Sequence, residues 1–232
     1  MMIIVTGASR GLGLEIAKAI VKNGGSVLGI ARHEPKDPAL LTDKFKFTCC
    51  DVSCYDSLKQ VANSLKKEKV ELEGIINAAG VASMNLAVLT PSHVVDRLID
   101  VNLKGTIFSC QLFAPLLFRK KRGFIINFST IAVAIGLKGE SIYVASKAGI
   151  EGFSRAFARE AADFNVRVNC VAPGPIDTDL IRNVGDDRIA KVVSHQVIPH
   201  QFGTDDIVNT VMLLCDEKAS AISGQVLHVG GA

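Results

Sequence analysis

MIIVTGASRGLG, residues 2–13, joins an apolar strand-like run to three glycines spaced Gly-x-x-x-Gly-x-Gly. The glycines permit a tight turn and let the backbone approach a pyrophosphate, and a helix that begins there offers free N–H groups and a partial positive charge. The stretch therefore predicts a strand, a phosphate-binding turn and a helix, in that order. The turn residues expected to hold a dinucleotide are Gly7, Ser9, Arg10, Gly11, Leu12 and Gly13.

Strand-like and helical patterns alternate along the rest of the chain. Strands are predicted over residues 2–6, 26–31, 45–51, 74–77, 123–129, 166–171 and 225–229. Helices are predicted over residues 11–23, 55–69, 91–118, 141–163 and 204–216. The alternation indicates a parallel, doubly wound α/β sheet of the Rossmann type, because each parallel step needs a crossover. The crossover at residues 32–44 is the exception, since Pro35 and Pro38 leave room for little more than one turn of helix.

The composition is that of one globular domain covering residues 1–232, with 48% hydrophobic and 21% charged residues. A net charge of +3 gives no reason to expect nucleic acid or an anionic membrane as a partner. No stretch reads as long and apolar enough to span a bilayer, and the chain begins without the basic region of a signal peptide, so a cytoplasmic protein is predicted. The six cysteines lack the paired spacing of a zinc site, so no metal is expected.

Tyr143 and Lys147 lie four residues apart in the helix predicted over residues 141–163. Residues at this spacing share one helix face. An unperturbed tyrosine has a pKa of about 10, and an adjacent ammonium lowers that pKa toward working pH. The pair is a candidate proton donor with its tuning cation, although most pairs at this spacing are surface contacts.

The glycine spacing and several later segments resemble the short-chain dehydrogenase/reductase family over nearly the whole chain. Asp51-Val52 matches the family's adenine-contacting pair, Asn77-Ala78-Ala79-Gly80 its Asn-x-Ala-Gly segment, and the loop at residues 173–178 its Pro-Gly loop beside the nicotinamide. The resemblance implies cofactor contacts from Asp51, Val52, Asn77, Ala78, Ala79, Gly80, Tyr143, Lys147, Pro173, Gly174, Ile176 and Thr178.

The same resemblance implies a catalytic set of Asn102, Ser129, Tyr143 and Lys147. Ser129 and Tyr143 would hydrogen-bond a substrate carbonyl, with Tyr143 as the proton donor. Lys147 would hold the nicotinamide ribose and lower the pKa of Tyr143. Asn102 would support a water leading from Lys147 to solvent.

The end of the second predicted strand decides between the two nicotinamide cofactors. An acidic residue there binds the ribose 2′-hydroxyl of NAD, whereas arginine suits the 2′-phosphate of NADP. This strand runs into Arg32, and Arg10 in the glycine turn is a second phosphate partner. NADP(H) is therefore expected, with NAD(H) as the alternative because Glu34 lies close in sequence.

Within the family, the segments at residues 152–156, 168–174 and 222–231 look most like 3-oxoacyl-(acyl-carrier-protein) reductases. That likeness implies reduction of a 3-oxoacyl thioester on an acyl carrier protein or coenzyme A, a substrate lid at about residues 179–201, and a homotetramer. The basic run Arg119–Arg122 would dock an acidic carrier or be a solvated helix end. Asp163-Phe164-Asn165 and the short crossover depart from the pattern, so sugar, steroid or quinone substrates and a non-catalytic nucleotide sensor stay open.

Overall fold

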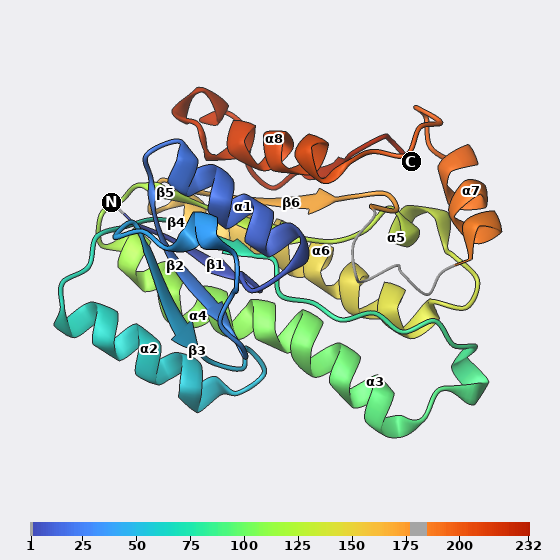
Figure 1. Ribbon diagram of the computed structural model, residues 1–232, viewed down its shortest axis with the longest axis horizontal. Helices are drawn as coiled ribbons and strands as arrows, with labels where there is room; N and C mark the ends of the chain where they lie inside the picture. Colours follow the sequence, from blue (N-terminus) through green and yellow to red (C-terminus); the bar gives the residue numbers. More distant parts are fainter. Residues whose placement is uncertain (1, 177–184) are drawn as a thin grey trace.

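In the part of the chain that the structure describes, seven parallel strands form one sheet in the order β3-β2-β1-β4-β5-β6-β7 (Figure 1). The computed structural model describes residues 2–176 and 185–232. Its strands are β1 Met2–Thr6, β2 Ser26–Ala31, β3 Phe45–Cys49, β4 Leu72–Asn77, β5 Gly123–Phe128, β6 Val166–Ala172 and β7 Val226–His228. The predicted doubly wound parallel sheet is confirmed, and each predicted strand overlaps an observed one.

Helices connect the strands. They are α1 Gly11–Lys22, α2 Tyr55–Lys67, α3 Ser92–Leu98, α4 Gly105–Phe118, α5 Ala132–Ile135, α6 Ser141–Ala162, α7 Asp186–Ser194 and α8 Thr204–Cys215. The single helix predicted over residues 91–118 is instead interrupted by a π-helical stretch, Ile99–Lys104. The short helices α5 and α7 were not predicted, because a helix of four residues such as α5 has no usable periodicity.

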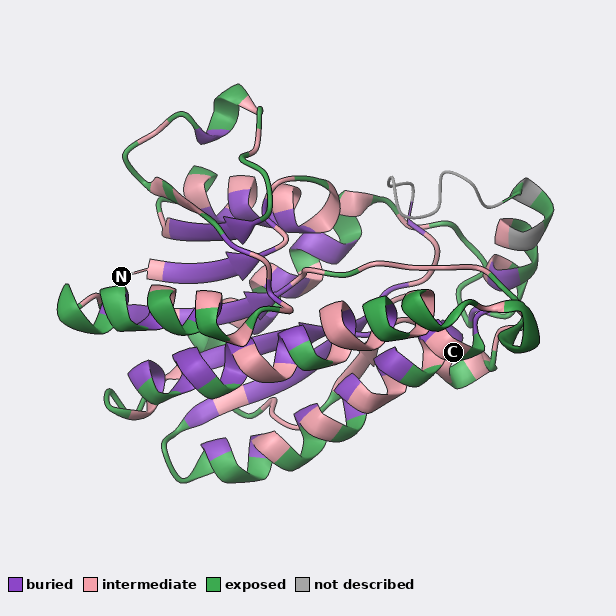
Figure 2. Ribbon diagram, turned by 90° about the horizontal axis from the view of Figure 1, so that it is seen from below, coloured by how far each residue is buried: buried purple, intermediate pink, exposed green. Residues whose placement is uncertain are grey.

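The sheet separates two hydrophobic cores. Alternate residues of a strand point to opposite faces, so on β5 Phe124, Ile126 and Phe128 face one core while Ile125 faces the other. The first core packs against α1 and α8, and the second against α2, α4 and α6 (Figure 1). Figure 2 shows the strands largely buried and the outward helix faces exposed. Burying one such side chain contributes about 1.5–3 kcal/mol, so the two cores hold the strand ends in place.

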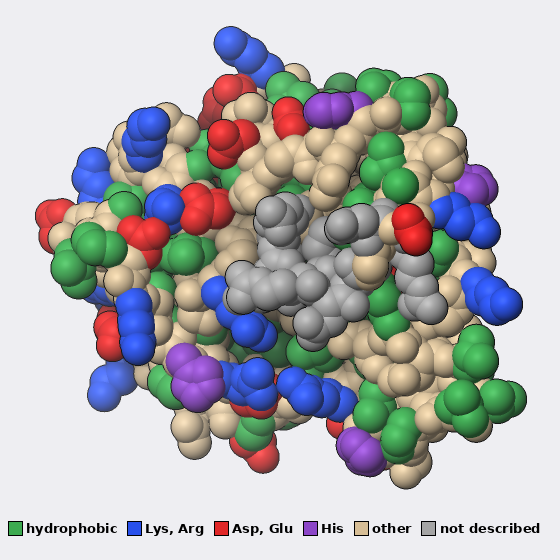
Figure 3. Space-filling view, turned by 45° about the vertical axis from the view of Figure 1, so that its right-hand side comes forward, with side chains coloured by type: hydrophobic (Ala, Val, Ile, Leu, Met, Phe, Trp, Pro, Cys, Tyr) green, Lys and Arg blue, Asp and Glu red, His purple; other side chains and the backbone are tan. Residues whose placement is uncertain are grey.

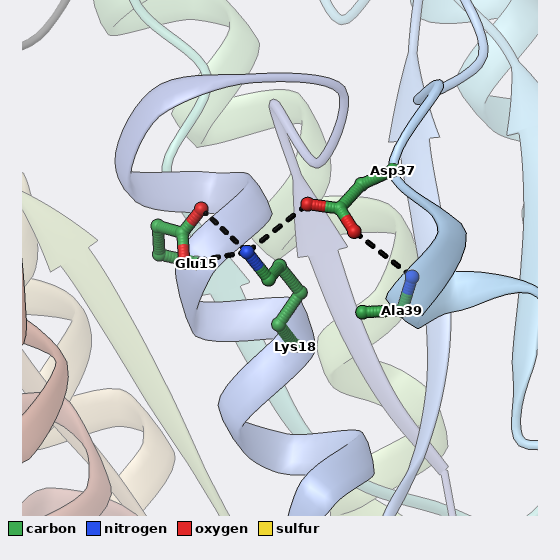
Figure 4. A network of polar contacts seen from close by, with 4 residues as sticks. All are labelled: Glu15, Lys18, Asp37 and Ala39. Atoms are coloured by element: carbon green, nitrogen blue, oxygen red, sulfur yellow. Dashed lines mark hydrogen bonds and ion pairs between the residues drawn. The ribbon is translucent and has the colours of Figure 1, made fainter.

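The crossover from β2 to β3 contains only a 3₁₀ turn, Pro38–Leu40, as the two prolines predicted. A polar network fastens this crossover to α1 (Figure 4). The Lys18 ammonium lies 3.0 Å from Glu15 and 3.0 Å from Asp37, and Asp37 also accepts the Ala39 N–H at 2.9 Å. The Asp37 and Glu15 hydrogen bonds raise the pKa of Lys18. The network thereby holds the crossover that follows Arg32 close to the first helix.

Among the described residues, one helical stretch, Ser92–Phe118, is long and apolar enough to cross a membrane, contrary to the sequence expectation. The stretch is 56% buried inside the protein. Phe113 and Leu117 of α4 have no exposed surface and belong to the core between the sheet and α2. Packing in the core accounts for the apolar composition of this stretch.

The close approach of α1 to β1 depends on the absence of a side chain at Gly13. A Cβ there would lie 2.4 Å from the Gly7 carbonyl oxygen. We expect Gly13→Ala to lower the free energy of unfolding by about 1–3 kcal/mol through overpacking, measured by denaturant titration. Gly152→Ala is the matched control, because nothing lies within 4 Å of its Cβ position. Equal stability of Gly13→Ala and the wild type would contradict this expectation.

Candidate functional site

A cavity of about 1050 Å³ opens at the carboxyl ends of the strands. β1 lies between β2 and β4, and Thr6 pairs with Ile30 on one side and Asn77 on the other, so these strands end at the same level. The chain winds away from β1 in opposite directions, which creates a crevice at this point of a doubly wound sheet. Loops after β1, β2, β4, β5 and β6 line the cavity, together with Tyr143 and Lys147 of α6 and Ile189 and Val192 of α7. Those last two residues belong to the stretch predicted as a substrate lid.

The glycine turn fits a pyrophosphate. Gly7 has a φ of +72°, and a Cβ there would lie 2.8 Å from the backbone of Ala79. The side chain of the N-cap residue, Arg10, makes no capping hydrogen bond to the amino terminus of α1, which favours binding of an anion by the first-turn N–H groups. A dinucleotide phosphate is the kind of group that such a turn accepts.

Cations outnumber acids among the described residues that line the cavity. The basic side chains are Arg10, Arg32, Lys36, Arg97, Lys138 and Lys147, and the acidic ones are Glu34, Asp51 and Glu140. Figure 3 shows acidic and basic side chains interspersed over the face that it draws. The excess of positive charge in the cavity favours a polyanionic ligand.

Asp51 and Arg97 both line the cavity, and the charge of Arg97 acts on the Asp51 carboxylate. Burial raises the pKa of Asp51, but hydrogen bonds from Ser53 and the charges of Arg32 and Arg97 outweigh it, so the pKa falls below its ordinary value. The Asp51 carboxylate accepts the Ser53 N–H at 2.9 Å and the Ser53 hydroxyl at 2.7 Å. Sequence reasoning missed Arg97, because its position depends on how α3 packs beside the cavity.

Most of the predicted cofactor residues line the cavity. Those that do are Gly7, Ser9, Arg10, Gly11, Leu12, Gly13, Arg32, Asp51, Val52, Ala78, Ala79, Gly80, Tyr143, Lys147, Pro173, Gly174 and Ile176. Asn77 does not, because its amide is buried and donates to Asn127 Oδ1 at 2.8 Å. Its expected cofactor contact stays a prediction. Thr178 lies outside the described residues.

Tyr143 and Lys147 both reach the cavity from the first turns of α6. The Thr130 hydroxyl lies near the Tyr143 phenol and acts to lower its pKa. The Lys147 ammonium donates to the Phe128 carbonyl at 2.8 Å and lies 5.9 Å from the centre of the Tyr143 ring. The predicted pair is thus brought together at the end of β5.

The electrostatics of the pair differ from the sequence expectation. Burial raises the pKa of Tyr143, the charge of Glu140 raises it further, and the Thr130 hydrogen bond lowers it only in part. Burial also lowers the pKa of Lys147 to about 8. The pKa of Tyr143 is therefore raised and not lowered as the sequence led us to expect, because burial is the largest influence on each of the two groups.

Ser129 and Thr130, adjacent at the end of β5, have different partners. The Ser129 hydroxyl donates to Glu151 Oε1 at 2.7 Å, on the α6 side of the sheet. Thr130 Oγ1 accepts the Ala132 N–H at 3.2 Å, which leaves its own O–H to donate, and it contacts Tyr143. Both residues line the cavity. The hydroxyl near Tyr143 is thus that of Thr130, whereas the predicted Ser129 directs its hydroxyl to Glu151.

Asn102 lies in the π-helical stretch, fully buried and not among the residues that line the cavity. Its Oδ1 accepts the Val81 N–H at 2.8 Å, and its Nδ2 donates to the Val81 carbonyl at 2.9 Å and to Ser146 Oγ at 3.0 Å. These contacts clamp the loop after β4 to α6. The water path expected from Lys147 is not tested by these contacts and stays a prediction.

Comparisons with known proteins agree with this geometry. A family model described as enoyl-(acyl carrier protein) reductase matches residues 7–231. The chain is 35% identical to the 3-oxoacyl-(acyl-carrier-protein) reductase FabG of Staphylococcus aureus, over 98% of this chain and 96% of that one. It is 32% identical to the Escherichia coli protein of the same name, over 98% and 95%. Among solved structures, ligand-free aldohexose dehydrogenase of Thermoplasma acidophilum matches with a TM-score of 0.87 at 30% identity, over 99% of this chain and 92% of that one.

The raised pKa of Tyr143 can be measured because the chain has only two tyrosines. In a Tyr55→Phe background, we expect the remaining phenol to stay protonated well above pH 10, near which an ordinary tyrosine titrates, when NMR follows isotope-labelled tyrosine. Glu140→Gln should lower the pKa of Tyr143, since it removes a negative charge that favours the neutral phenol. A phenol that titrates at its ordinary pKa, or one that ignores Glu140→Gln, would refute this electrostatic picture.

Proposed function

Because the chain belongs to the short-chain dehydrogenase/reductase family of oxidoreductases, we propose that it reduces 3-oxoacyl thioesters to 3-hydroxyacyl thioesters with NADPH. One observation carries the proposal. A phenol and a hydroxyl, Tyr143 and Thr130, lie near each other at the wall of a cavity whose other end is a glycine phosphate turn. The two relatives at 35% and 32% identity, both named 3-oxoacyl-(acyl-carrier-protein) reductase, support the substrate class.

The residues of the cavity would hold NADPH along its length. The glycine turn and the amino terminus of α1 suit the pyrophosphate, while Arg10 and Arg32 suit the 2′-phosphate. Lys147 and the loop at residues 173–176 would hold the nicotinamide end. Bound there, NADPH supplies the hydride that reaches the carbonyl carbon.

The protein's own contribution is a proton and two hydrogen bonds. The Thr130 O–H and the Tyr143 phenol bind the carbonyl oxygen, and their dipoles stabilise the charge that grows there. Tyr143 then donates its proton to that oxygen. A raised pKa keeps the phenol protonated at neutral pH, and Lys147, with a pKa of about 8, returns a proton to the phenolate.

Thr130 takes the role that sequence reasoning gave to Ser129. Its hydroxyl contacts the proton donor, whereas the hydroxyl proton of Ser129 is committed to Glu151. A hydroxyl has one proton to donate, so Ser129 has none left for a substrate oxygen.

An acyl carrier would reach the cavity by a different route than the basic run Arg119–Arg122 first suggested. This run precedes β5 and therefore lies at the amino edge of the sheet, opposite the cavity. Lys120 pairs with Glu71 at 3.0 Å, and Arg122 pairs with Glu217. A carrier bound there would serve the cavity of another subunit in the expected homotetramer, while Lys138 and Arg97 stand at the cavity of the same subunit.

A second candidate function is oxidation of a polyhydroxy substrate such as an aldose. Glu140 is buried, lines the cavity and lies near Tyr143, where a carboxylate suits substrate hydroxyl donors. The 30% identical aldohexose dehydrogenase points the same way. Parallel assays of 3-oxoacyl thioesters with NADPH and of aldoses with NADP⁺ separate the two functions.

Removal of the proton donor tests the chemistry. We expect Tyr143→Phe to lower kcat for thioester reduction by about 10²- to 10⁴-fold while NADPH still binds, as followed by cofactor fluorescence. Tyr55→Phe is the matched control, since Tyr55 packs edge-on against Phe108 away from the cavity. Full activity in Tyr143→Phe would exclude Tyr143 as the donor.

The choice between the two hydroxyls is tested separately. We expect Thr130→Ala to lower kcat by about 10²- to 10³-fold, the usual effect of removing one donor to a developing oxyanion. Thr130→Ser keeps the hydroxyl and should keep most of the activity in the same steady-state assay. Wild-type kcat in Thr130→Ala would show that a group other than Thr130 donates the second hydrogen bond to the carbonyl oxygen.

A further inference from the structure

Two polar contacts join α6 to the end of β5, one at Asn127 in the strand and one at Ser129 just after it. Asn127 Nδ2 donates to Ser154 Oγ at 2.8 Å, and Ser129 Oγ donates to Glu151 Oε1 at 2.7 Å. Two residues along a strand and three along a helix cover similar lengths, about 6.6 Å and 4.5 Å, so the contacts follow one another as rungs. The second rung ends one residue before Thr130. Glu151 is thus a buried acid close to the site that the proposed chemistry does not use.

Glu151 is held almost entirely inside the protein. Its side chain is 8% exposed, and besides Ser129 its carboxylate has only a distant contact with Arg155 among the ion pairs of the described residues, at 3.7 Å. Arg155 is itself 56% exposed. A buried carboxylate is costly unless hydrogen bonds satisfy it, and a hydroxyl that donates to a carboxylate makes one of the stronger hydrogen bonds in proteins. The hydrogen bond from Ser129 is therefore the strongest interaction that holds the Glu151 carboxylate in place.

On the β6 side, backbone hydrogen bonds hold the residues on either side of Thr130. The Ser129 N–H donates to the Val171 carbonyl at 2.8 Å, and the Ile131 N–H donates to the Pro173 carbonyl at 3.0 Å. On the opposite side the end of β5 is held by α6, through Lys147 to the Phe128 carbonyl and through Glu151 to Ser129. Tyr143, Lys147 and Glu151 are spaced four residues apart and so share one face of that helix.

We infer that Glu151 is a positioning residue, which acts through Ser129 to set the end of β5 so that the Thr130 hydroxyl meets Tyr143. Helix α6 then positions both the proton donor Tyr143 and, through Glu151, the Thr130 hydroxyl. Small displacements of a reacting group are costly, and 1 Å can lower a rate by about a hundredfold. The inference rests on the proposed reductase function for its kinetic readout, but not for its spectroscopic one.

The test compares Ser129→Ala, Glu151→Ala, Glu151→Gln and the double variant Ser129→Ala/Glu151→Ala with the wild type. We expect each Ala variant to lower kcat about tenfold, well below the effect of a direct donor, with the KM for NADPH unchanged. The double variant should lose no more than either single one, because both changes break the same link. Glu151→Gln retains an acceptor oxygen and should restore most of the activity.

Ser154→Ala is the matched control. It breaks the neighbouring rung between the same two elements, so it should lower the melting temperature and leave kcat unchanged. If Ser154→Ala lowers kcat as much as Ser129→Ala, or if the losses of the single variants multiply, the link is structural only and the inference fails. Wild-type kcat in both Ser129→Ala and Glu151→Ala also overturns it.

A second readout does not need activity. In the Tyr55→Phe background, the NMR signal of the Tyr143 ring reports its hydrogen bond to Thr130. Ser129→Ala and Glu151→Ala should move this signal in the same direction as Thr130→Ala, and Ser154→Ala should not. If the wild type reduces no carbonyl yet the signal moves as expected, the proposed function fails and the positioning role stands; an unmoved signal overturns the positioning role alone.

Discussion

The packing of α6 against the end of β5 is the constraint on which the site depends. Four side chains of the helix make polar contacts with four successive residues of the strand end: Ser154 with Asn127, Lys147 with the Phe128 carbonyl, Glu151 with Ser129, and Tyr143 with Thr130. A shift of one residue in the strand would turn every side chain to the other face. The hydrogen bonds therefore fix the register between strand and helix more sharply than apolar packing alone would, because each lost partner leaves a buried polar group unsatisfied.

Burial of these groups also sets their chemistry. Removed from water, Lys147 loses affinity for its proton and Tyr143 gains it, since burial disfavours the charged form of each. Burial thus biases the phenol toward its neutral form, which can donate a proton. Glu140 adds to this bias through its negative charge. The protonation states available for the proposed reaction thus follow from where the fold places charge and excludes water.

The sequence predicted the features that local chemistry decides. The glycine turn identified the cofactor end of the cavity, because only glycine tolerates the positive φ of Gly7 and the close contact at Gly13. The two prolines predicted the short crossover after β2. Alternating strands and helices predicted the parallel sheet, since parallel strands need crossovers. Each of these depends on a few neighbouring residues.

What the sequence missed depends on contacts between distant segments. Ser129 and Thr130 are both hydroxyl residues at a strand end, and only the position of α6 decides which one meets Tyr143. Asn77 lies in a segment that matches the family's cofactor site, but the sequence does not show that its amide is hydrogen-bonded to the buried Asn127. Arg97 lines the cavity from α3, and helix propensities do not predict the π-helical stretch that follows this helix.

The central claim is that this arrangement reduces a ketone with hydride from NADPH, and the direct test is wild-type turnover. Protein supplied with NADPH and acetoacetyl-CoA or an acyl-carrier thioester should consume NADPH and form one 3-hydroxyacyl thioester for each NADPH oxidised, more slowly with NADH. Tight binding of NADPH without reduction of either thioester would contradict the account.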